Sequence, residues 1–343
     1  MKEFHPTIMS GPPGTPGPAP GWSDGEVNTS ADSLALIEGE GGQAPPQRPE
    51  VAPTRRRRVP LILLALLAPT ALFALALTIL PLGYAVVTSF RSFRFGQPVA
   101  FIGLQNYFDL FRDSNFYRSL GTTLTFTIVA TTVEFILGMM LALLLKEEFR
   151  WQGLIRSCLM IPMVVAPVVV GIVWRLLYSS DVGLLSYGVQ LMMGHPISVL
   201  SNPSLALPAI ILVDIWEWTP FMFLILLAGI QSLPQEPFEA ARVDGAGPWS
   251  TFRYLTLPML RPVIVVAVLI RALDAFTVFD QVFVLTQGGP GMATEVSTLM
   301  VYKTAFRFSQ FGYAAAMAVT LLILVLFLSA AISRSLQGQV LQV

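Results

Sequence analysis

Six long apolar stretches constrain this chain more than any other feature, because each is long enough to cross a lipid bilayer. A helix needs about 20 apolar residues to span the hydrocarbon core. The stretches cover residues 59–90, 121–145, 158–178, 205–233, 263–285 and 311–332. Charged residues make up 12% of the 343-residue chain, about half of their usual share in soluble domains. The sequence therefore predicts an all-α membrane protein with six transmembrane helices.

Residues 1–58, which precede the first span, are rich in proline, glycine, serine and glutamate and show almost no apolar periodicity. A segment of this composition cannot bury enough apolar surface to offset the entropy of ordering it. We therefore expect a disordered cytoplasmic tail. The transmembrane domain should then cover residues 59–335, with a short tail at 336–343.

Basic residues set the expected orientation. Four consecutive arginines, residues 55–58, directly precede the first span and should hold the N-terminus in the cytoplasm. Six crossings return the C-terminus to the same side. Counted from residue 48 on, segments expected inside carry twelve Lys or Arg residues and segments expected outside carry six, which favours this N-in, C-in arrangement. Two shorter apolar segments, at residues 101–111 and 184–193, should form short helices on the outer side.

The loop between the fourth and fifth spans, residues 234–262, is polar and helix-forming. Prolines at its start favour a new helix over residues 238–243, and Asp244-Gly245 should stop that helix because glycine tolerates a left-handed backbone. Pro248 then opens a second short helix, and Pro258 and Pro262 should turn the chain back into the membrane. An ordinary solvated loop is the alternative to a docking element.

The residues of this loop resemble the EAA loop of binding-protein-dependent ABC importer permeases. The matching groups are Glu239-Ala240-Ala241, Asp244-Gly245-Ala246 and Leu255-Thr256-Leu257-Pro258. Further groups are similar to carbohydrate-importing permeases: Phe101-Ile102-Gly103-Leu104-Gln105-Asn106-Tyr107, Trp216-Glu217-Trp218-Thr219-Pro220-Phe221, Leu285-Thr286-Gln287-Gly288-Gly289-Pro290 and Gly312-Tyr313-Ala314-Ala315-Ala316. The last two look more like the first permease of a heterodimeric pair. The resemblance covers about residues 60–335 and includes the maltose and glycerol-phosphate permeases.

This resemblance implies the type I ABC importer permease fold in a bacterial inner membrane, with a cytoplasmic coupling helix. It implies that Glu239, Ala240, Ala241, Asp244, Gly245, Ala246, Leu257 and Pro258 contact a dimeric ATPase. It also implies a second permease subunit as heterodimer partner and an extracytoplasmic solute-binding protein. ATP and magnesium would belong to the ATPase, because this chain has no Gly-x-x-x-x-Gly-Lys-Ser/Thr motif. The solute would be a di- or oligosaccharide or a polyol, with a glycerol phosphate as the alternative.

Ionisable residues inside the spans need a partner or a water-filled path, because an isolated charge in hydrocarbon is costly. They are Glu134, Arg175, Asp214, Glu217, Arg271, Asp274 and Asp280. Arg271 and Asp274 are three residues apart and should pair on one helix, and we expect an arginine of another span to hold Glu134. Sugars bind to carboxylates and aromatic faces, so the candidates for a substrate path are Asp280, Phe276, Glu217 and Trp218.

The sequence argues against several other functions. Its formal net charge of zero gives no indication of nucleic acid binding, and its two histidines exclude a histidine-rich metal site. No catalytic group is apparent, so we expect a non-catalytic subunit rather than an intramembrane enzyme. An ion-coupled carrier would show an internal repeat, and none is evident. The single cysteine, Cys158, should be a buried, inert thiol.

Overall fold

The computed structural model describes residues 61–147, 150–193 and 198–340. The predicted tail 1–58 and the last residues, 341–343, lie outside the described residues. All elements discussed below belong to the compact unit Ala65–Val343, apart from the first residues of α1. Five helices are long and apolar enough to cross a membrane, and one bent pair of helices makes up to six. The prediction of a helical protein with six apolar spans is therefore confirmed.

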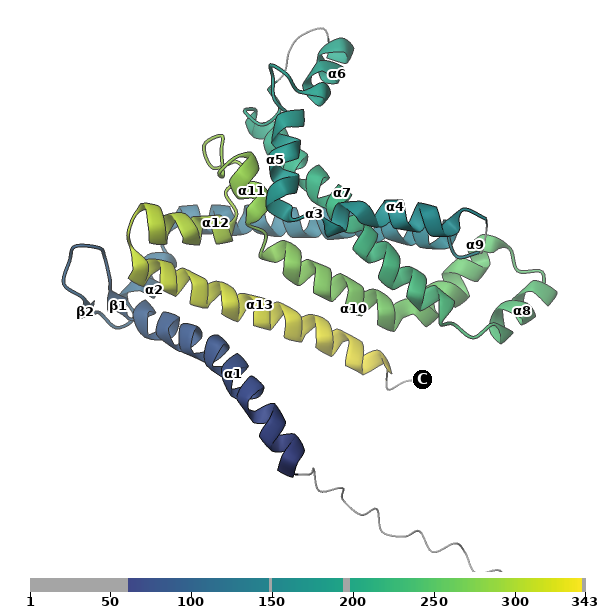
Figure 1. Ribbon diagram of the computed structural model, residues 1–343, viewed down its shortest axis with the longest axis horizontal. Helices are drawn as coiled ribbons and strands as arrows, with labels where there is room; N and C mark the ends of the chain where they lie inside the picture. Colours follow the sequence, from purple (N-terminus) through teal and green to yellow (C-terminus); the bar gives the residue numbers. More distant parts are fainter. Residues whose placement is uncertain (1–60, 148–149, 194–197, 341–343) are drawn as a thin grey trace, which may run out of the picture. The chain divides into compact units, whose positions relative to one another are not determined.

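Figure 1 shows a short helix and a β-hairpin at opposite ends of the packed long helices. We call the end with α8 (Glu236–Val243) the loop end and the end with the β-hairpin the hairpin end. The long helices are α1 (Leu61–Ser89), α3 (Ser114–Leu144), α7 (Pro203–Gln231), α10 (Leu257–Phe276) and α13 (Phe311–Val340).

The hairpin end is built from short elements that tie α1 to α13. Strands β1 (Arg91–Ser92) and β2 (Ala100–Phe101) pair antiparallel, and α2 (Gln105–Leu110) follows them. The buried Asn106 side chain donates to the backbone oxygens of Ser89 and Arg91 at 2.8 and 3.1 Å. These bonds satisfy carbonyl groups where α1 ends, so α2 is fixed against the chain that leaves the span. The short helix expected within residues 101–111 is confirmed.

The core lies where α3, α7 and α10 pack together. One buried cluster joins Phe126 and Ala130 of α3 to Ile210 and Val213 of α7, and a second joins Met139 to Phe223 and Leu260 nearer the loop end. Helix α1, in contrast, exposes its apolar side chains, and none of its membrane-spanning window is buried in this chain. The described chain therefore leaves much of its apolar surface for lipid or for another subunit.

The third apolar stretch, 158–178, is not the straight helix that we predicted. It is divided between α4 (Gln152–Val164) and α5 (Pro167–Leu177), whose axes differ by 93°. Val165 and Ala166 have extended backbone, with ψ of 136° and 134°. Proline disfavours the helical conformation in the residue before it and lacks an N–H group to continue the ladder, so the helix breaks before Pro167. Helix α6 (Leu184–Met193) then forms over the predicted segment.

The fifth stretch also differs from its prediction. The chain does not turn at Pro258 or Pro262 but stays helical from α9 (Pro248–Thr251) through the π-helical turn η2 (Phe252–Thr256) into α10. The wider turn precedes Pro258, which has no N–H to donate, so the missing bond does not end the helix. Helix α10 ends at Phe276. After three intervening residues α11 (Asp280–Leu285) begins, followed by α12 (Ser297–Tyr302) and η3 (Lys303–Arg307).

Candidate functional site

The predicted docking loop forms a compact helical knob at the loop end. Helix α8 has Pro237 in its first turn together with Glu236 and Glu239, whose carboxylates complement the positive end of the helix dipole. The helix stops at Asp244, and Gly245 has the left-handed φ of 75°. The N–H of Ala246 donates to the Ala241 oxygen at 2.9 Å, which closes the turn. The predicted stop at Asp244-Gly245 is therefore confirmed.

No residue of α8 is buried in this chain. Val243 is 88% exposed and Trp249, at the start of α9, is 71% exposed. The ring of Trp249 contacts only the ring of Phe252 among the aromatic rings of the described residues, with the two ring centres 5.7 Å apart. The structure therefore brings Glu239, Ala240, Ala241, Asp244, Gly245 and Ala246 together on one exposed turn, while Leu257 and Pro258 begin α10.

A second site is a charge cluster inside the three core helices. The Arg271 guanidinium of α10 donates Nε to Glu134 Oε2 at 2.7 Å and Nη2 to Glu134 Oε1 at 2.9 Å. Nη2 also donates to Asp214 of α7, and Nη1 donates to Asp274 Oδ2 at 2.9 Å. The expected pairing of Arg271 with Asp274, and of Glu134 with an arginine from another span, is confirmed. Asp214 as a further partner was not foreseen.

Two neighbouring groups extend this cluster along α7. The Trp218 ring faces the Arg271 guanidinium, with the Cζ atom 5.2 Å from the ring centre, a distance suited to a cation–π contact. Glu217 is buried and accepts a hydrogen bond from Gln281 Nε2 of α11. This bond joins α7 to the helix that follows the break after α10.

The four predicted path residues do not lie together. Glu217 and Trp218 border the Arg271 cluster, and Asp280 is exposed at the first turn of α11. Phe276, in contrast, is 3% exposed and packs with Leu110, Phe116 and Met317. Its ring belongs to a packing cluster of this chain.

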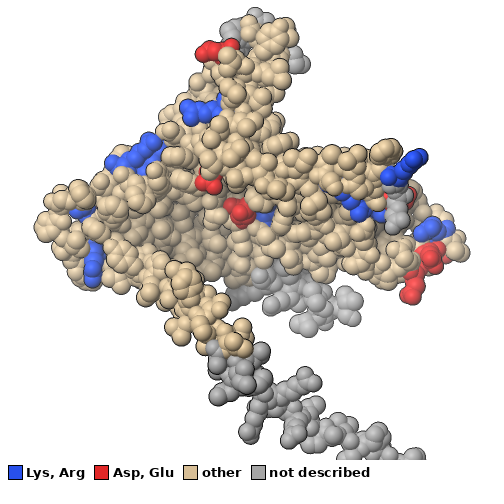
Figure 2. Space-filling view, viewed as in Figure 1, with Lys and Arg blue, Asp and Glu red and all other residues tan. Residues whose placement is uncertain are grey.

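Asp274 is a path candidate that the sequence reasoning treated only as a structural partner. Its side chain is 51% exposed although it lies within a span. Val266, Ile270, Asp274 and Thr277 are all exposed and recur at helical spacing, so they form one open face of α10. Figure 2 shows acidic atoms, with basic atoms beside them, near the middle of the face in view. A half-exposed carboxylate within a span needs water or a partner group beside it rather than lipid.

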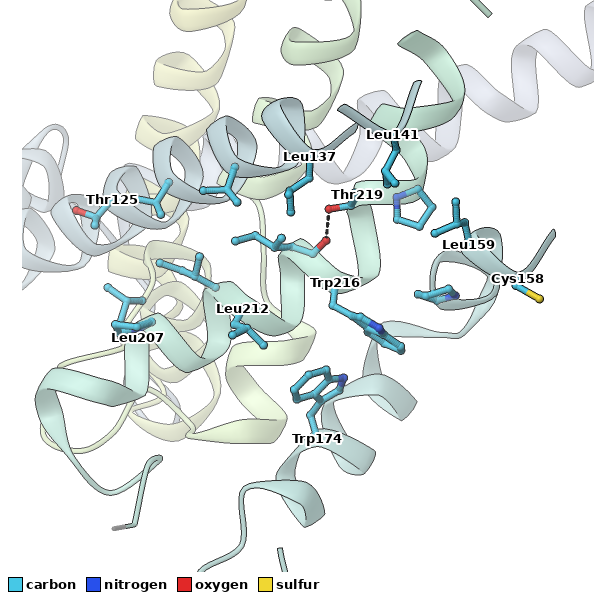
Figure 3. A pocket seen from close by; sticks show the side chains of 17 residues that line it. Thr125, Leu137, Leu141, Cys158, Leu159, Trp174, Leu207, Leu212, Trp216 and Thr219 are labelled. Atoms are coloured by element: carbon cyan, nitrogen blue, oxygen red, sulfur yellow. Dashed lines mark hydrogen bonds between the residues drawn. The ribbon is translucent and has the colours of Figure 1, made fainter. Parts of the chain in front are cut away.

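A groove of about 910 Å³ lies on another side of the molecule, between α3, α7 and the bent α4–α5 pair (Figure 3). Trp174 and Trp216 meet edge to face there with ring centres 5.5 Å apart. The other lining residues are mostly aliphatic or proline, with hydroxyls only from Thr125 and Thr219. Cys158 is exposed and lines this groove, so the prediction of a buried thiol is wrong. A saccharide needs many hydrogen-bond partners, and this groove offers few.

Residues 134–338 match the sequence model of the family described as the binding-protein-dependent transport system inner membrane component. The chain belongs to this family. It is a multi-pass permease subunit of the inner membrane, and it is not the subunit that hydrolyses ATP. The matched segment contains the loop 234–262 and the whole Arg271 cluster.

Relatives cover most of the permease. A probable ABC transporter permease protein, y4oQ of Sinorhizobium fredii, is 39% identical over 82% of this chain and 93% of its own length. The trehalose/maltose transport system permease protein MalF of Thermococcus litoralis is 36% identical over 76% of this chain and 88% of its own. The trehalose transport system permease protein SugA of Mycobacterium tuberculosis is 36% identical over 74% of this chain and 81% of its own length.

The fold agrees with these relatives. A solved bacterial ABC transporter that imports the acidic polysaccharide alginate has a chain with a TM-score of 0.69 to this one, at 24% sequence identity. The match covers 80% of this permease and 96% of that chain. The permease therefore has the fold of an ABC importer membrane subunit.

Proposed function

We propose that this permease forms half of a saccharide pathway and receives the movement of a separate ATPase dimer through residues 234–262. The observation that carries the coupling role is the exposed helical turn at the loop end. Its residues Val243 and Trp249 are apolar and largely uncovered, which is typical of a surface that binds a partner. The left-handed turn at Gly245 keeps that surface compact.

The saccharide assignment rests on two supports. Relatives at about a third identity are named as trehalose/maltose and trehalose permeases. In addition, Asp274 and Asp280 expose carboxylates on either side of the α10–α11 break. Carboxylates accept several hydrogen bonds, as the hydroxyl groups of a sugar require. We propose that Phe276 does not contact the sugar and instead stabilises the α10–α11 break by packing.

A neutral saccharide fits this site better than a glycerol phosphate. Arg271 is 1% exposed, and its contacts to Glu134, Asp214 and Asp274 already occupy all three of its nitrogen atoms. It therefore has no free edge for a phosphate, which would need an accessible arginine or lysine.

The partners follow from the same proposal. A second, similar permease would complete the pathway and cover apolar surface that this chain leaves open, and a solute-binding protein would deliver the sugar at the hairpin end. ATP and magnesium would be held by the ATPase. The residues expected to contact it are Glu239, Ala240, Ala241, Asp244, Gly245 and Ala246, with Leu257 and Pro258 supporting the loop from α10.

Site-specific crosslinking tests the coupling role. In a Cys158→Ala background, Ala241→Cys or Ala246→Cys should form crosslinks to the ATPase in the assembled, transporting complex. Phe95→Cys, which lies at the hairpin end and is 81% exposed, is the matched control and should form none. If the two loop cysteines never react with the ATPase in a working complex, the coupling proposal is wrong.

A further inference from the structure

One nitrogen of Arg271 serves two buried carboxylates. Nη2 donates to Glu134 Oε1 at 2.9 Å and also to Asp214 Oδ2. Glu134 is 0% exposed and Asp214 is 2% exposed. The two acidic side chains come from different spans, α3 and α7, so the fold itself forces them to the same point. Like charges held this close inside a protein repel strongly, because the surrounding dielectric is low.

The charges around this point do not balance if both carboxylates are ionised. Arg271 supplies one positive charge against Glu134 and Asp214, and no other Lys or Arg in the described residues forms an ion pair with them. The other groups that the structure describes around Arg271 add no positive charge. Trp218 covers the guanidinium, and Asp274 is acidic. Glu217 of α7 and Gln281 of α11 lie beside the cluster. A buried excess charge of this kind costs several kcal/mol.

We propose that the Glu134–Asp214 pair is a proton-binding site, which holds one proton while Arg271 neutralises the remaining negative charge. The bidentate contact of Arg271 with Glu134 matches an ionised carboxylate. Asp214 meets only one nitrogen, so it is the partner that carries the proton for most of the time. Asp274 is half exposed and is not part of the buried pair.

Buried hydroxyl groups on α3 lead to Glu134. Thr123, Thr127, Thr131 and Glu134 recur at spacings of four, four and three residues and are all buried, so they lie on one face of the helix. The hydroxyls of Thr127 and Thr131 have no hydrogen-bond partner among the described residues. Because these hydroxyls have no such partner, the row is a polar face of α3 that ends at Glu134 rather than a connected chain of hydrogen bonds.

The site links helix packing to pH. The folded permease binds one proton at this pair, whereas exposed carboxyls of an unfolded chain are ionised at neutral pH. Because the folded state then holds more protons, its stability falls as the pH is raised. Loss of the proton leaves Glu134 and Asp214 repelling each other across the contact between α3 and α7.

Infrared spectroscopy of the purified, assembled transporter tests the site. A Glu217→Gln background first removes the third buried carboxyl of the cluster. In that background we expect the carbonyl stretch of a protonated, buried carboxylic acid, shifted in heavy water, and we expect Asp214→Asn to abolish it. Asp274→Asn, which changes the exposed carboxylate, is the matched control and should leave the band in place.

Assembly and thermal stability give a second readout that does not depend on the band. Asparagine mimics a neutral aspartic acid, so Asp214→Asn should assemble and should lose less stability than the parent when the pH is raised.

An absent band in the Glu217→Gln background, or a band that Asp274→Asn removes, would overturn the proposal. So would failure of both Asp214→Asn and Glu134→Gln to assemble, because both carboxylates would then be needed in ionised form. A band that appears only when sodium is withdrawn would assign the site to a metal cation and contradict proton binding.

Discussion

Gly138 of α3 faces Met222 of α7 so closely that no methyl group fits between the helices. A Cβ atom on Gly138 would lie 2.7 Å from Met222 Cβ and 2.9 Å from the Phe223 nitrogen. Glycine at such a crossing lets two helix backbones approach, which is how membrane helices gain packing energy when lipid is as apolar as their side chains. The contact lies one helical turn from Glu134, so it also fixes the depth at which the charge cluster forms.

The first prediction concerns this contact. Gly138→Ala should lower the stability of the assembled permease by roughly 1–3 kcal/mol, the usual cost of overpacking a rigid core. The obstacle is backbone and a Cβ atom, so neither can move aside. Gly121→Ala on the same helix is the control, since no atom lies within 4 Å of its Cβ position. Thermal unfolding in detergent measures both variants, and equal melting temperatures would contradict the packing argument.

The second prediction concerns Arg271. Arg271→Met should leave Glu134 and Asp214 buried without a cation, at a cost of about 3–5 kcal/mol, and we expect most of the protein to fail to assemble. Arg271→Lys should recover only part of the loss, because an ammonium group cannot make the two parallel bonds to Glu134. Arg261→Met, at an exposed position of the same helix, is the matched control. The fraction of permease that stays in the complex after extraction gives the comparison.

The third prediction concerns the turn of the loop 234–262, which we propose to couple the spans to the ATPase. Gly245 has a φ of 75°, and its N–H donates to the Arg242 oxygen at 3.1 Å. Proline can adopt neither that angle nor that bond, so Gly245→Pro should uncouple ATP hydrolysis from transport while the spans stay folded. Gly245→Ala should cost about 1–2 kcal/mol locally and have a milder effect.

Gly247→Ala provides the control for this loop, because the φ of Gly247 is −71° and no atom lies within 4 Å of its Cβ position. Transport and ATPase rates in proteoliposomes should separate the three variants. Parental import by an assembled Gly245→Pro complex would show that the turn does not transmit movement.

The positions of the apolar spans were predictable from the sequence, but their bends were not. Residues 158–178 form one apolar run, and the break before Pro167 leaves no mark in hydropathy. Proline alone does not decide the matter, because Pro208 and Pro220 lie inside α7 without ending it. Whether a proline breaks a helix depends on whether neighbouring helices hold the chain straight. Tertiary packing decides this, and the local sequence does not show it.

The candidate site shows the same division between local and long-range information. Arg271 and Asp274 are three residues apart on one helix, so their pairing follows from helical geometry. The meeting of Glu134 with Asp214 depends on how α3 and α7 pack, which no local pattern encodes. Phe276 was proposed for the path because of its residue type, and its burial reflects the rotation of α10 about its own axis.

The last prediction separates the two exposed carboxylates of the proposed sugar path. Asp280 accepts no side-chain hydrogen bond from the described residues, so Asp280→Ala should weaken saccharide uptake without changing assembly. Each lost hydrogen bond to the sugar is worth about 1 kcal/mol. Losing one or two of them should raise the sugar concentration at half-maximal uptake roughly 5- to 30-fold. Asp274→Ala should impair uptake similarly and also lower stability slightly, since Asp274 contacts Arg271. Asp109→Ala, at an exposed position of α2 near the hairpin, is the control and should leave both properties unchanged. Unchanged half-saturation and maximal rate in both path variants would move the sugar contacts to the partner permease.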